Sequence, residues 1–421
     1  MIYVLFSGNE AGQESGSTVN YSNGGAISIG GNAYITASNC EFTANRARNG
    51  GCVAYNSTVT STFTDCNFHD NVCRSGANKD GSNGNGNFNG AALQQGGGTI
   101  EFVQCVFNKN IVQGSSSVLH MNGENNNTTA YFTDCQFIEN KSFGNNGCIK
   151  MEKAGEKLYL NRCVFRGNSS ASRGIINPNG NTLLFMNDVT FKDNFTTAGQ
   201  KSWGVAIHQG QANVCMNNVT AHNNHNTSSD PTSVISFNGD GGWLITNSTI
   251  ADKTPYAIIR VGNAAGHLTL CNNILINSLT AAKVFEVAAE TQFDDKGHNI
   301  MSCEGTHGKC TPVKSDLLNQ TETTLAGTYS EVLTGSHPYG VYSWTNALEG
   351  FSAATAADVY AAISGYTRAD SVVGSTNIGA DFWNWLKEIG AAAETEGAYT
   401  FKDARGVART GTMWPGAYQA N

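Results

Sequence analysis

The stretch Ser38–Arg48, SNCEFTANRAR, decides the fold, because its pattern Cys-x-Phe-x-x-Asn returns along the chain. Successive cysteine positions lie between 26 residues (Cys40 to Cys66) and 39 residues (Cys66 to Cys105) apart. The repeated cysteines are Cys40, Cys66, Cys105, Cys135 and Cys163. The phenylalanines are Phe42, Phe68, Phe107, Phe137, Phe165 and Phe191, and the asparagines are Asn45, Asn71, Asn110, Asn140, Asn168 and Asn194. A short unit that returns at this period is a repeat array.

Other columns keep the same frame. The residue three before each cysteine position is apolar, and short runs of glycine followed by small or β-branched residues separate the copies. Cysteine and phenylalanine stand two residues apart, so both point to one side of a strand. No helical periodicity of apolar residues interrupts the units. The pattern predicts an all-β fold, a single-stranded parallel β-helix of about ten coils over residues 1–301, with each repeated column stacked as a ladder.

The handedness and the turns follow from general rules. Parallel strands joined by crossovers favour a right-handed path, so we expect a right-handed solenoid. Asparagine tolerates the left-handed backbone of a sharp turn, and stacked amides bond along a ladder. We therefore expect the repeated asparagines to occupy the left-handed turn positions.

These residues resemble known families. Residues 1 to about 300 look like a β-helix of the pectate-lyase-like superfamily. Gly24-Gly25-Ala26-Ile27 together with Phe-x-x-Asn resembles the repeats of polymorphic outer-membrane adhesins. The ending Asp403-x-x-Gly406-x-x-Arg409 with Pro415-Gly416-Ala417-Tyr418 is similar to that of secreted β-helix proteins of Bacteroidota-like bacteria. The resemblance implies a secreted or cell-surface protein, but this superfamily contains lyases, hydrolases and adhesins alike.

Composition limits the partners. The net charge of −8 argues against nucleic acid, which requires a clustered basic face. No apolar run is long enough to span a membrane. Val4, Phe6 and Asn9 already match the repeat, so we expect the chain to begin inside a coil, with upstream coils and an export signal missing. We expect a monomer.

The chain has 12 cysteines, and the ladder cysteines are expected to be packed thiols rather than bridges. Cys303 and Cys310 bound a polar loop, which favours a local disulfide, with a metal knuckle around His307 as the alternative. The insertion from Arg74 to Asn87 is either a tolerated loop or a lid over a binding site.

Residues 302–421 differ in character. Ala353–Ser364 and Ala380–Ile389 have helical patterns, and four of the six tryptophans lie in this part. We expect a small mixed cap or flank that packs its aromatic residues on the solenoid; a sugar-stacking platform is the alternative. Asp403 and Arg409 are expected to pair or to hold a turn.

Two outer columns carry charges on consecutive coils. Asp134, Arg162 and Asp188 directly precede the cysteine position. They are either a carboxylate pair for metal or acid–base chemistry, or an exposed ion ladder. Directly after the phenylalanine position come Arg166, Lys192 and His222, a basic stripe that an acidic glycan would meet, or else a solvated surface. Lys201, Trp203 and His208 form a third cluster and a candidate binding site.

The motifs of the resembling enzymes are missing. The adjacent pair Asp294-Asp295 lies where the coils end, and neither Gly-His-Gly nor an Arg-x-Pro-x-Arg segment is present. We therefore expect an adhesin-like scaffold that binds carbohydrate or another host or cell-surface ligand, with no cofactor and no metal. The alternative is a polysaccharide lyase or glycoside hydrolase acting on an acidic glycan at the outer face, for which Ca²⁺ would be the expected ion.

Overall fold

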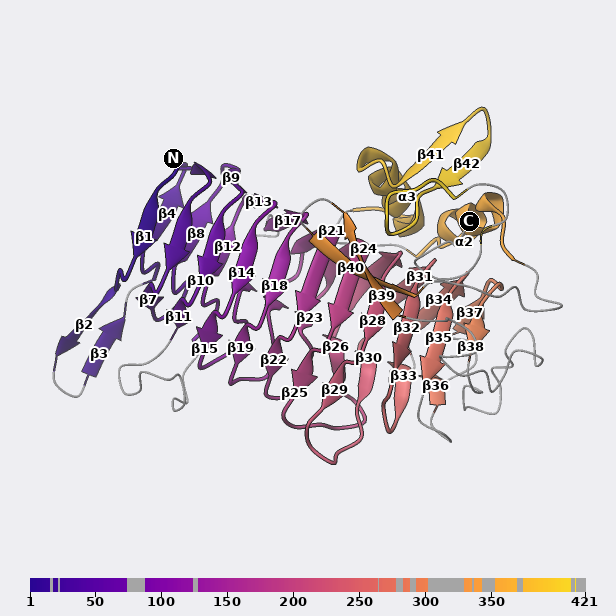
Figure 1. Ribbon diagram of the computed structural model, residues 1–421, viewed down its shortest axis with the longest axis horizontal. Coiled ribbons are helices and arrows are strands. Elements are labelled where there is room, and N and C mark those ends of the chain that lie inside the picture. The colour runs from indigo at the N-terminus through magenta and orange to yellow at the C-terminus, as the bar shows by residue number, and fades with distance from the viewer. Residues whose placement is uncertain are drawn as a thin grey trace.

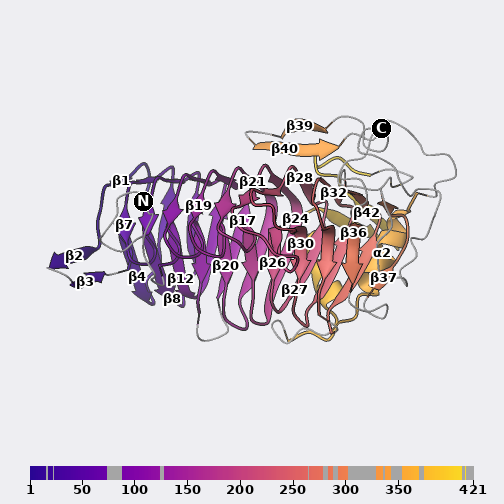
Figure 2. The ribbon, with the colours of Figure 1, turned by 90° about the horizontal axis from the view of Figure 1, so that it is seen from below.

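The chain winds into a parallel β-solenoid (Figures 1 and 2). This computed structural model describes residues 1–15, 18–21, 23–73, 88–123, 128–263, 265–277, 283–287, 293–301, 329–334, 337–342, 353–368, 374–409 and 413. The predicted parallel β-helix is confirmed, with about nine turns in place of about ten. Two helices and two small antiparallel pairs follow toward the C-terminus.

Three parallel sheets form the walls of the solenoid, and each turn of the chain contributes strands to them. Sheet 1 is 19-stranded, and most turns cross it as two short strands separated by a bend. Its strands are β1 (Leu5–Ser7), β5 (Thr36–Ser38), β6 (Glu41–Thr43), β9 (Ser61–Thr64), β10 (Asn67–His69), β13 (Thr99–Val103), β14 (Val106–Asn108), β17 (Thr129–Thr133), β18 (Gln136–Ile138), β21 (Lys157–Arg166), β24 (Thr182–Lys192), β27 (Ala212–Asn217), β28 (Thr220–His222), β31 (Gly242–Thr246), β32 (Thr249–Asp252), β34 (His267–Cys271), β35 (Ile274–Asn277), β37 (Phe293–Asp295) and β38 (Ile300–Met301).

Sheets 2 and 3 complete each turn. The two-residue strands of sheet 2 are β7 (Arg46–Ala47), β11 (Val72–Cys73), β15 (Ile111–Val112), β19 (Lys141–Ser142), β22 (Ser169–Ser170), β25 (Phe195–Thr196) and β29 (His225–Asn226). The strands of sheet 3 are β4 (Ile27–Gly31), β8 (Val53–Ser57), β12 (Leu93–Gly97), β16 (Leu119–Met121), β20 (Ile149–Met151), β23 (Ile176–Pro178), β26 (Gly204–Gln209), β30 (Ser233–Phe237), β33 (Ala257–Val261) and β36 (Lys283–Val287). A separate hairpin, β2 (Gly12–Ser15) with β3 (Thr18–Tyr21), is inserted in the first turn between β1 and β4.

Left-handed residues make the bends. The residue before each cysteine position has a positive φ, as at Asp134 (57°), Arg162 (52°) and Asp188 (54°). A second left-handed residue directly precedes the ladder asparagine, as Glu139 (φ 52°) precedes Asn140. The expectation that the ladder asparagines themselves are left-handed is therefore wrong. The bend comes one residue earlier, and it leaves the asparagine side chain pointing inward, where it is buried.

Stacked side chains fill the interior. The phenylalanine rings lie parallel on one another, for example Phe107 on Phe137 with centroids 5.1 Å apart and Phe137 on Phe165 at 4.1 Å. Rings of a neighbouring column meet them edge-on, as Phe132 meets Phe137 at 5.2 Å. Offset and edge-to-face contacts of this kind are favourable beyond the area they bury. The ladder cysteines are free, buried thiols, as predicted.

The buried asparagine ladder is fully hydrogen-bonded. The Nδ2 group of Asn140 donates to Oδ1 of Asn168 at 3.0 Å and to the carbonyl oxygen of Phe107 at 2.9 Å. Its Oδ1 accepts from the backbone N–H and from Nδ2 of Asn110, at 3.0 and 2.9 Å. Burying an amide costs free energy unless its hydrogen-bond partners are supplied, and here the copies of the repeat in the adjacent turns supply them.

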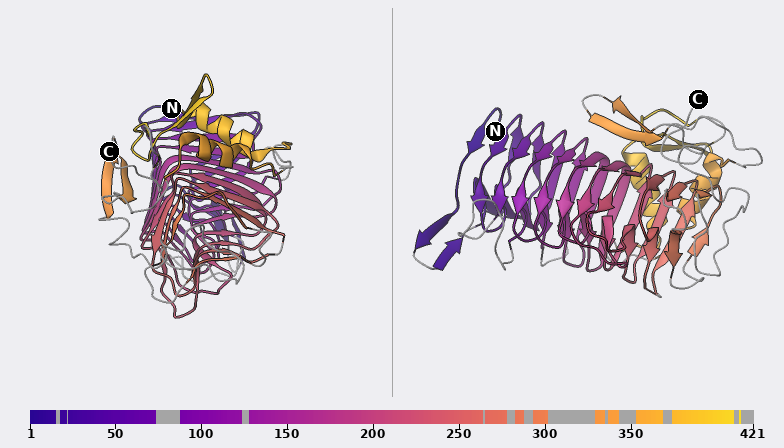
Figure 3. Two further views of the ribbon diagram at one scale, coloured as in Figure 1. Left: turned by 90° about the vertical axis from the view of Figure 1, so that its right-hand side faces the viewer. Right: turned by 60° about the horizontal axis from the view of Figure 1, so that its bottom comes forward.

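The C-terminal elements lie against the outside of the solenoid wall (Figure 3). They are the hairpin β39 (Tyr329–Thr334) with β40 (His337–Tyr342), the helices α2 (Ala356–Ser364) and α3 (Ile378–Glu388), and the hairpin β41 (Ala392–Thr395) with β42 (Ala398–Phe401). Both helices were predicted. Phe382 and Trp385 of α3 pack on Phe185, which faces outward from β24. Trp383 and Trp385 are only 4% and 7% exposed, so they pack as part of a flank and offer no open sugar platform.

Some predicted features lie outside the described residues. These are the insertion from Arg74 to Asn87, the Cys303–Cys310 loop, and Pro415 to Tyr418. Within the part of the chain that is described, no helix is long and apolar enough to cross a membrane.

Candidate functional site

Sheet 3 presents one column of outward residues in register from turn to turn. Pairings between neighbouring strands place Gln94 beside His120, and His120 beside Lys150. The whole column reads Ser28, Ala54, Gln94, His120, Lys150, Asn177, His208, Ser236, Arg260 and Glu286. Unlike the interior ladders, this column changes its residue at nearly every turn, and most of its members are polar or charged.

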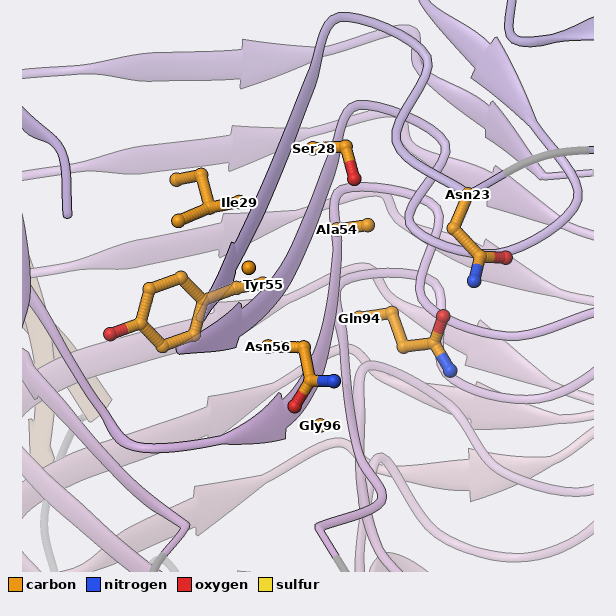
Figure 4. Close-up of a pocket in the computed structure, with 9 residues that line it drawn as sticks. Asn23, Ser28, Ile29, Ala54, Tyr55, Asn56, Gln94 and Gly96 are labelled. Atoms are coloured by element: carbon orange, nitrogen blue, oxygen red, sulfur yellow. The ribbon is translucent and has the colours of Figure 1, made fainter. Parts of the chain in front are cut away.

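Two neighbouring cavities open on this face. The first, of about 320 Å³, is lined by Asn23, Ser28, Tyr55, Asn56 and Gln94 among others (Figure 4). The second, of about 310 Å³, is also lined by Gln94. Gln94 borders both cavities, which therefore lie side by side on this face, over β4, β8, β12, β16 and β20, and make up one hollowed surface. We call it the sheet 3 groove.

The second cavity has a floor and a wall from different parts of the turn. Its floor is the outward column, with Gln94, His120 and Lys150. Its wall is the connection that leads from sheet 2 to sheet 3, where Asn49, Asn89 and Ser115 are stacked in register. Further lining residues are Arg48, Gly114, Asn122, Glu152 and Lys153. Charged groups therefore come from both sides of the cavity.

At this cavity Glu152 is bound by two side chains, those of His120 and Lys150. Nε2 of His120 is 2.7 Å from Oε2 of Glu152, and Nζ of Lys150 is 3.2 Å from the same oxygen. The hydrogen bond from His120 lowers the pKa of Glu152 to about 2, with a smaller contribution from Lys150. Burial lowers the pKa of His120, which is only 1% exposed. At neutral pH the pair is thus a neutral imidazole bound to an ionised carboxylate.

The same loop holds a second carboxyl group. Glu156 is fully buried, and its two oxygens accept from the backbone N–H groups of Gly123 and Glu152 at 2.9 and 2.7 Å. Burial raises the pKa of Glu156 to about 7. These bonds tie the end of β20 to the segment that follows β16, so they fix the position of Glu152 at the edge of the cavity.

Two buried acceptors in this lining lack a partner. They are Nδ1 of His120 and Oδ1 of Asn122, neither of which has a hydrogen-bond partner among the described residues. Since the ionised Glu152 can only accept, the neutral imidazole carries its hydrogen on Nε2, and Nδ1 offers a lone pair. Buried polar atoms without partners are uncommon in folded proteins, and they mark places where a ligand or water supplies the missing bond.

The predicted acid–base–acid column lies elsewhere, at the bend of sheet 1. Arg162 binds Asp134 with two hydrogen bonds, Nε to Oδ1 at 2.6 Å and an Nη to Oδ2 at 2.7 Å. Asp188 is buried and accepts from Asn187 and Asn218, each at 2.9 Å. Burial raises the pKa of Asp188 to about 7. Because Asp188 is covered, the column is not an ion ladder exposed along its whole length, and its catalytic role stays a prediction.

The cover over Asp188 comes from the C-terminal flank. Asn218 donates to Lys402 O at 2.7 Å and accepts from a guanidinium N–H of Arg409 at 2.9 Å. Asp403 accepts from the backbone N–H groups of Arg405 and Val407, so it holds a turn, as predicted. The conspicuous C-terminal motif thus docks the flank onto the bend of sheet 1.

The predicted basic stripe is assembled as expected on sheet 1. Arg166 pairs in register with Lys192, and Lys192 with His222. All three side chains are half-buried, and β40 lies against the strands that carry them. The imidazole Nδ1 of His222 is 3.2 Å from Ala251 O. The role of the stripe in glycan binding stays a prediction, and none of its residues lines the sheet 3 groove.

The third predicted cluster lies on sheet 3, three turns beyond His120. His208 is buried in the outward column, and burial, with the charges of Arg173 and Arg260, lowers its pKa to about 3. Lys201 lies over the ring of Tyr256, with Nζ 5.3 Å from the centroid. Trp203 is half-buried just before β26. Only His208 therefore belongs to the outward column of sheet 3, while Lys201 and Trp203 lie in the segment before β26.

Sequence reasoning missed His120, Lys150 and Glu152. The outward column of sheet 3 could have been found only by counting from the glycine-rich run of each turn, and the number of residues between that glycine and the column is not constant. Gln94 follows Gly90 by four residues, and Lys150 follows Gly147 by three. In the described part of the chain, no group of three or more His, Cys, Asp or Glu residues is placed to hold a metal ion.

Comparison with known proteins identifies no relative: no protein-family model, curated protein or solved structure matches the chain. The class is therefore defined by the fold, and the chain is a parallel β-solenoid with a polar groove on one outer sheet. The finer resemblance to pectate-lyase-like and adhesin families stays a prediction.

Proposed function

We propose that this protein is a secreted or cell-surface scaffold of adhesin type that binds carbohydrate in the sheet 3 groove. The observation that carries the proposal is the pair of neighbouring polar cavities that share Gln94. Amide and hydroxyl groups line the first cavity together with the apolar Ile29 and Ala54, and charged groups line the second. Concave sites with a few convergent polar groups are the usual binding sites of proteins.

The geometry suits a chain-like ligand. The groove crosses successive strands, which stack about 4.8 Å apart in a sheet, so a polymer lying along the axis meets a different outward residue at each strand. Saccharide hydroxyls both donate and accept hydrogen bonds, and so do the side-chain amides of Asn23, Asn56 and Gln94. A groove of fixed backbone and varied side chains is the arrangement by which solenoids build extended binding surfaces.

The test is a binding screen of the full chain against neutral and acidic polysaccharides, followed by Gln94→Trp. We expect at least one polysaccharide to bind, and Gln94→Trp to weaken that binding more than about tenfold, because the bulky indole would stand where the two cavities meet. Gln136→Trp on β18 of sheet 1 is the matched control and should bind like the parent protein. A panel without any binder, or full binding by Gln94→Trp, would contradict the proposal.

The second candidate is an enzyme, a polysaccharide lyase or glycoside hydrolase. It is favoured by the contact of the neutral His120 with the ionised Glu152 at a cavity, since displaced pKa values that cluster in a cleft are typical of catalytic sites. The same screen records the ultraviolet absorbance of unsaturated sugars and new reducing ends. Product that forms with the parent protein and disappears with His120→Gln would favour the enzyme; binding without product supports the scaffold.

A further inference from the structure

We propose that the second cavity of the sheet 3 groove is a subsite for an acidic sugar unit. Its anionic group would lie between Arg48, Lys150 and Lys153, and its hydroxyls would donate to His120 and Asn122. The inference rests on the proposed function and names its ligand class. It requires a ligand that combines one negative charge with hydrogen-bond donors on a single ring.

The charge of the cavity favours an anion. Arg48, Lys150 and Lys153 line it together with a single carboxylate, that of Glu152. Glu152 is bound by His120 and Lys150, while Arg48 and Lys153 form no ion pair with any described residue. The formal balance of the ionised groups is three positive against one negative, in a chain whose net charge is −8. A cationic pocket attracts anionic ligands, even where the protein as a whole is acidic.

The acceptors of the cavity favour hydroxyl groups. Nδ1 of His120 and Oδ1 of Asn122 are buried acceptors to which no residue in the described part of the chain donates. A carboxylate or an inorganic anion has no hydrogen to give them, whereas a sugar hydroxyl has. The imidazole ring of His120 cannot flip and exchange the positions of Nε2 and Nδ1 without breaking the 2.7 Å contact between Nε2 and Glu152. Glu152 is therefore a positioning residue, which keeps the imidazole lone pair available to the ligand.

A matched series of polymers tests both features on the full chain. The probes are polygalacturonate, its carboxyl-reduced neutral form, and the sulfated form of that neutral polymer. Binding is measured by calorimetry at two ionic strengths. We expect polygalacturonate to bind more than about tenfold tighter than the reduced polymer, with the difference shrinking at high salt because exposed cations are screened. Stronger binding of the sulfated polymer would assign the anion as a sulfate ester rather than a carboxylate.

Variants then separate the two features. Arg48→Gln and Lys153→Gln should each weaken the acidic polymer about threefold to tenfold, and leave the neutral polymer unchanged. Asn122→Ala should weaken both polymers by a similar factor, because it removes a hydroxyl contact rather than a charge. Lys141→Gln on β19 is the matched charge control, for which no change is expected. Lys192→Gln tests the rival anion site, the basic stripe on sheet 1.

The outcomes distinguish this inference from the proposed function. If neutral and acidic polymers bind equally, and Arg48→Gln and Lys153→Gln change neither, the acidic subsite is wrong while carbohydrate binding stands. If acidic polymers lose affinity with Lys192→Gln instead, the anion is bound by sheet 1 and the subsite is again wrong. If no polysaccharide binds at all, the proposed function fails, and the subsite fails with it.

Discussion

Two columns of this solenoid stack at the same interval and differ in every other respect. Inside, the asparagine ladder repeats one residue type from Asn9 to Asn224, and each amide binds the next. Outside, the column of sheet 3 changes from Gln94 to His120 to Lys150 over consecutive turns. Identical residues are needed where each turn must satisfy its neighbour's buried polar groups. Varied residues can stand where solvent or a ligand satisfies them.

The contrast teaches where to look for function in a repeat protein. Repetition marks the positions that hold the turns together, because an interior amide without its neighbour would be left unpaired. Departure from repetition marks positions that are free to specialise. The sheet 3 groove lies on such a column, and its unpaired acceptors lie on the turn where the charged residues gather.

The largest expected effect comes from breaking the interior column. Asn140→Ala removes four hydrogen bonds and leaves the backbone N–H of Asn110 buried without its acceptor. At about 1 kcal/mol for each bond and about 1–3 kcal/mol for the stranded group, we expect a loss of about 5 kcal/mol in the free energy of unfolding. Urea denaturation measures it. The exposed Asn145→Ala is the control; its side chain accepts a single hydrogen bond, from Ser172, so stability should change by only about 1 kcal/mol. Equal effects would erase the contrast between the columns.

The next effect is a pH dependence at the bend of sheet 1. The pKa of Asp188 is raised to about 7 in the folded protein, while an unfolded aspartate titrates near 3.8. The folded protein therefore holds this proton more tightly, so the contribution of Asp188 to stability is greatest at acidic pH and falls as the pH rises from about 4 to about 7. The loss can reach roughly 4 kcal/mol, the equivalent of about three pKa units.

Comparison with Asp188→Asn isolates this contribution, because both proteins share all other titrating groups, including the buried His120 and His208. Denaturation at several pH values should show the stability of the parent protein falling toward neutral pH relative to the variant. Parallel pH profiles for the two proteins would show that Asp188 keeps an ordinary pKa.

A smaller effect is expected in the aromatic ladder. Phe137→Leu keeps an apolar side chain but removes the ring that stacks between Phe107 and Phe165 and meets Phe132 edge-on. We expect a loss of about 1–3 kcal/mol, since aromatic pairs contribute about 0.5–1.5 kcal/mol each beyond the area they bury. Thermal denaturation is the measurement, with Gln136→Ala on the outward side of the same strand as the control. A shift no greater than that of the control would mean that stacking adds nothing to burial.

The smallest stability effect is expected on the outer column. Lys150→Gln removes a partly buried ion pair, in which the side chains of Lys150 and Glu152 are 17% and 37% exposed, but Glu152 keeps its hydrogen bond from His120. The free energy of unfolding should change by less than about 0.5 kcal/mol, measured by urea denaturation as for Asn140→Ala. A loss comparable to that of Asn140→Ala would show that this column supports the fold in the same way as the interior, and the contrast on which the site was chosen would fall.

Much of the fold could be predicted from the residues, and little of the site. Cys40, Phe42 and Asn45 and their repeats predicted the parallel solenoid, the free thiols and the stacked ladders, because a buried column must repeat to be satisfied. The helices α2 and α3 were visible in their apolar spacing. The sheet 3 groove was not, because a column that differs at each turn leaves no pattern, and register shifts near Gly97 and Gly204 displace it in the sequence.

The sequence alone determined which residues stack inside, since the period of the repeat and the burial of its polar members allow few other arrangements. Only the tertiary structure decided which outward residues become neighbours. Lys150 and Glu152 follow His120 by 30 and 32 residues in the sequence. They lie next to it because one turn of the solenoid brings them there. Likewise, the burial of Asp188 depends on the docked C-terminal flank. Arg409 of the flank donates to Asn218, a residue that binds Asp188, although 191 residues separate Arg409 from Asn218.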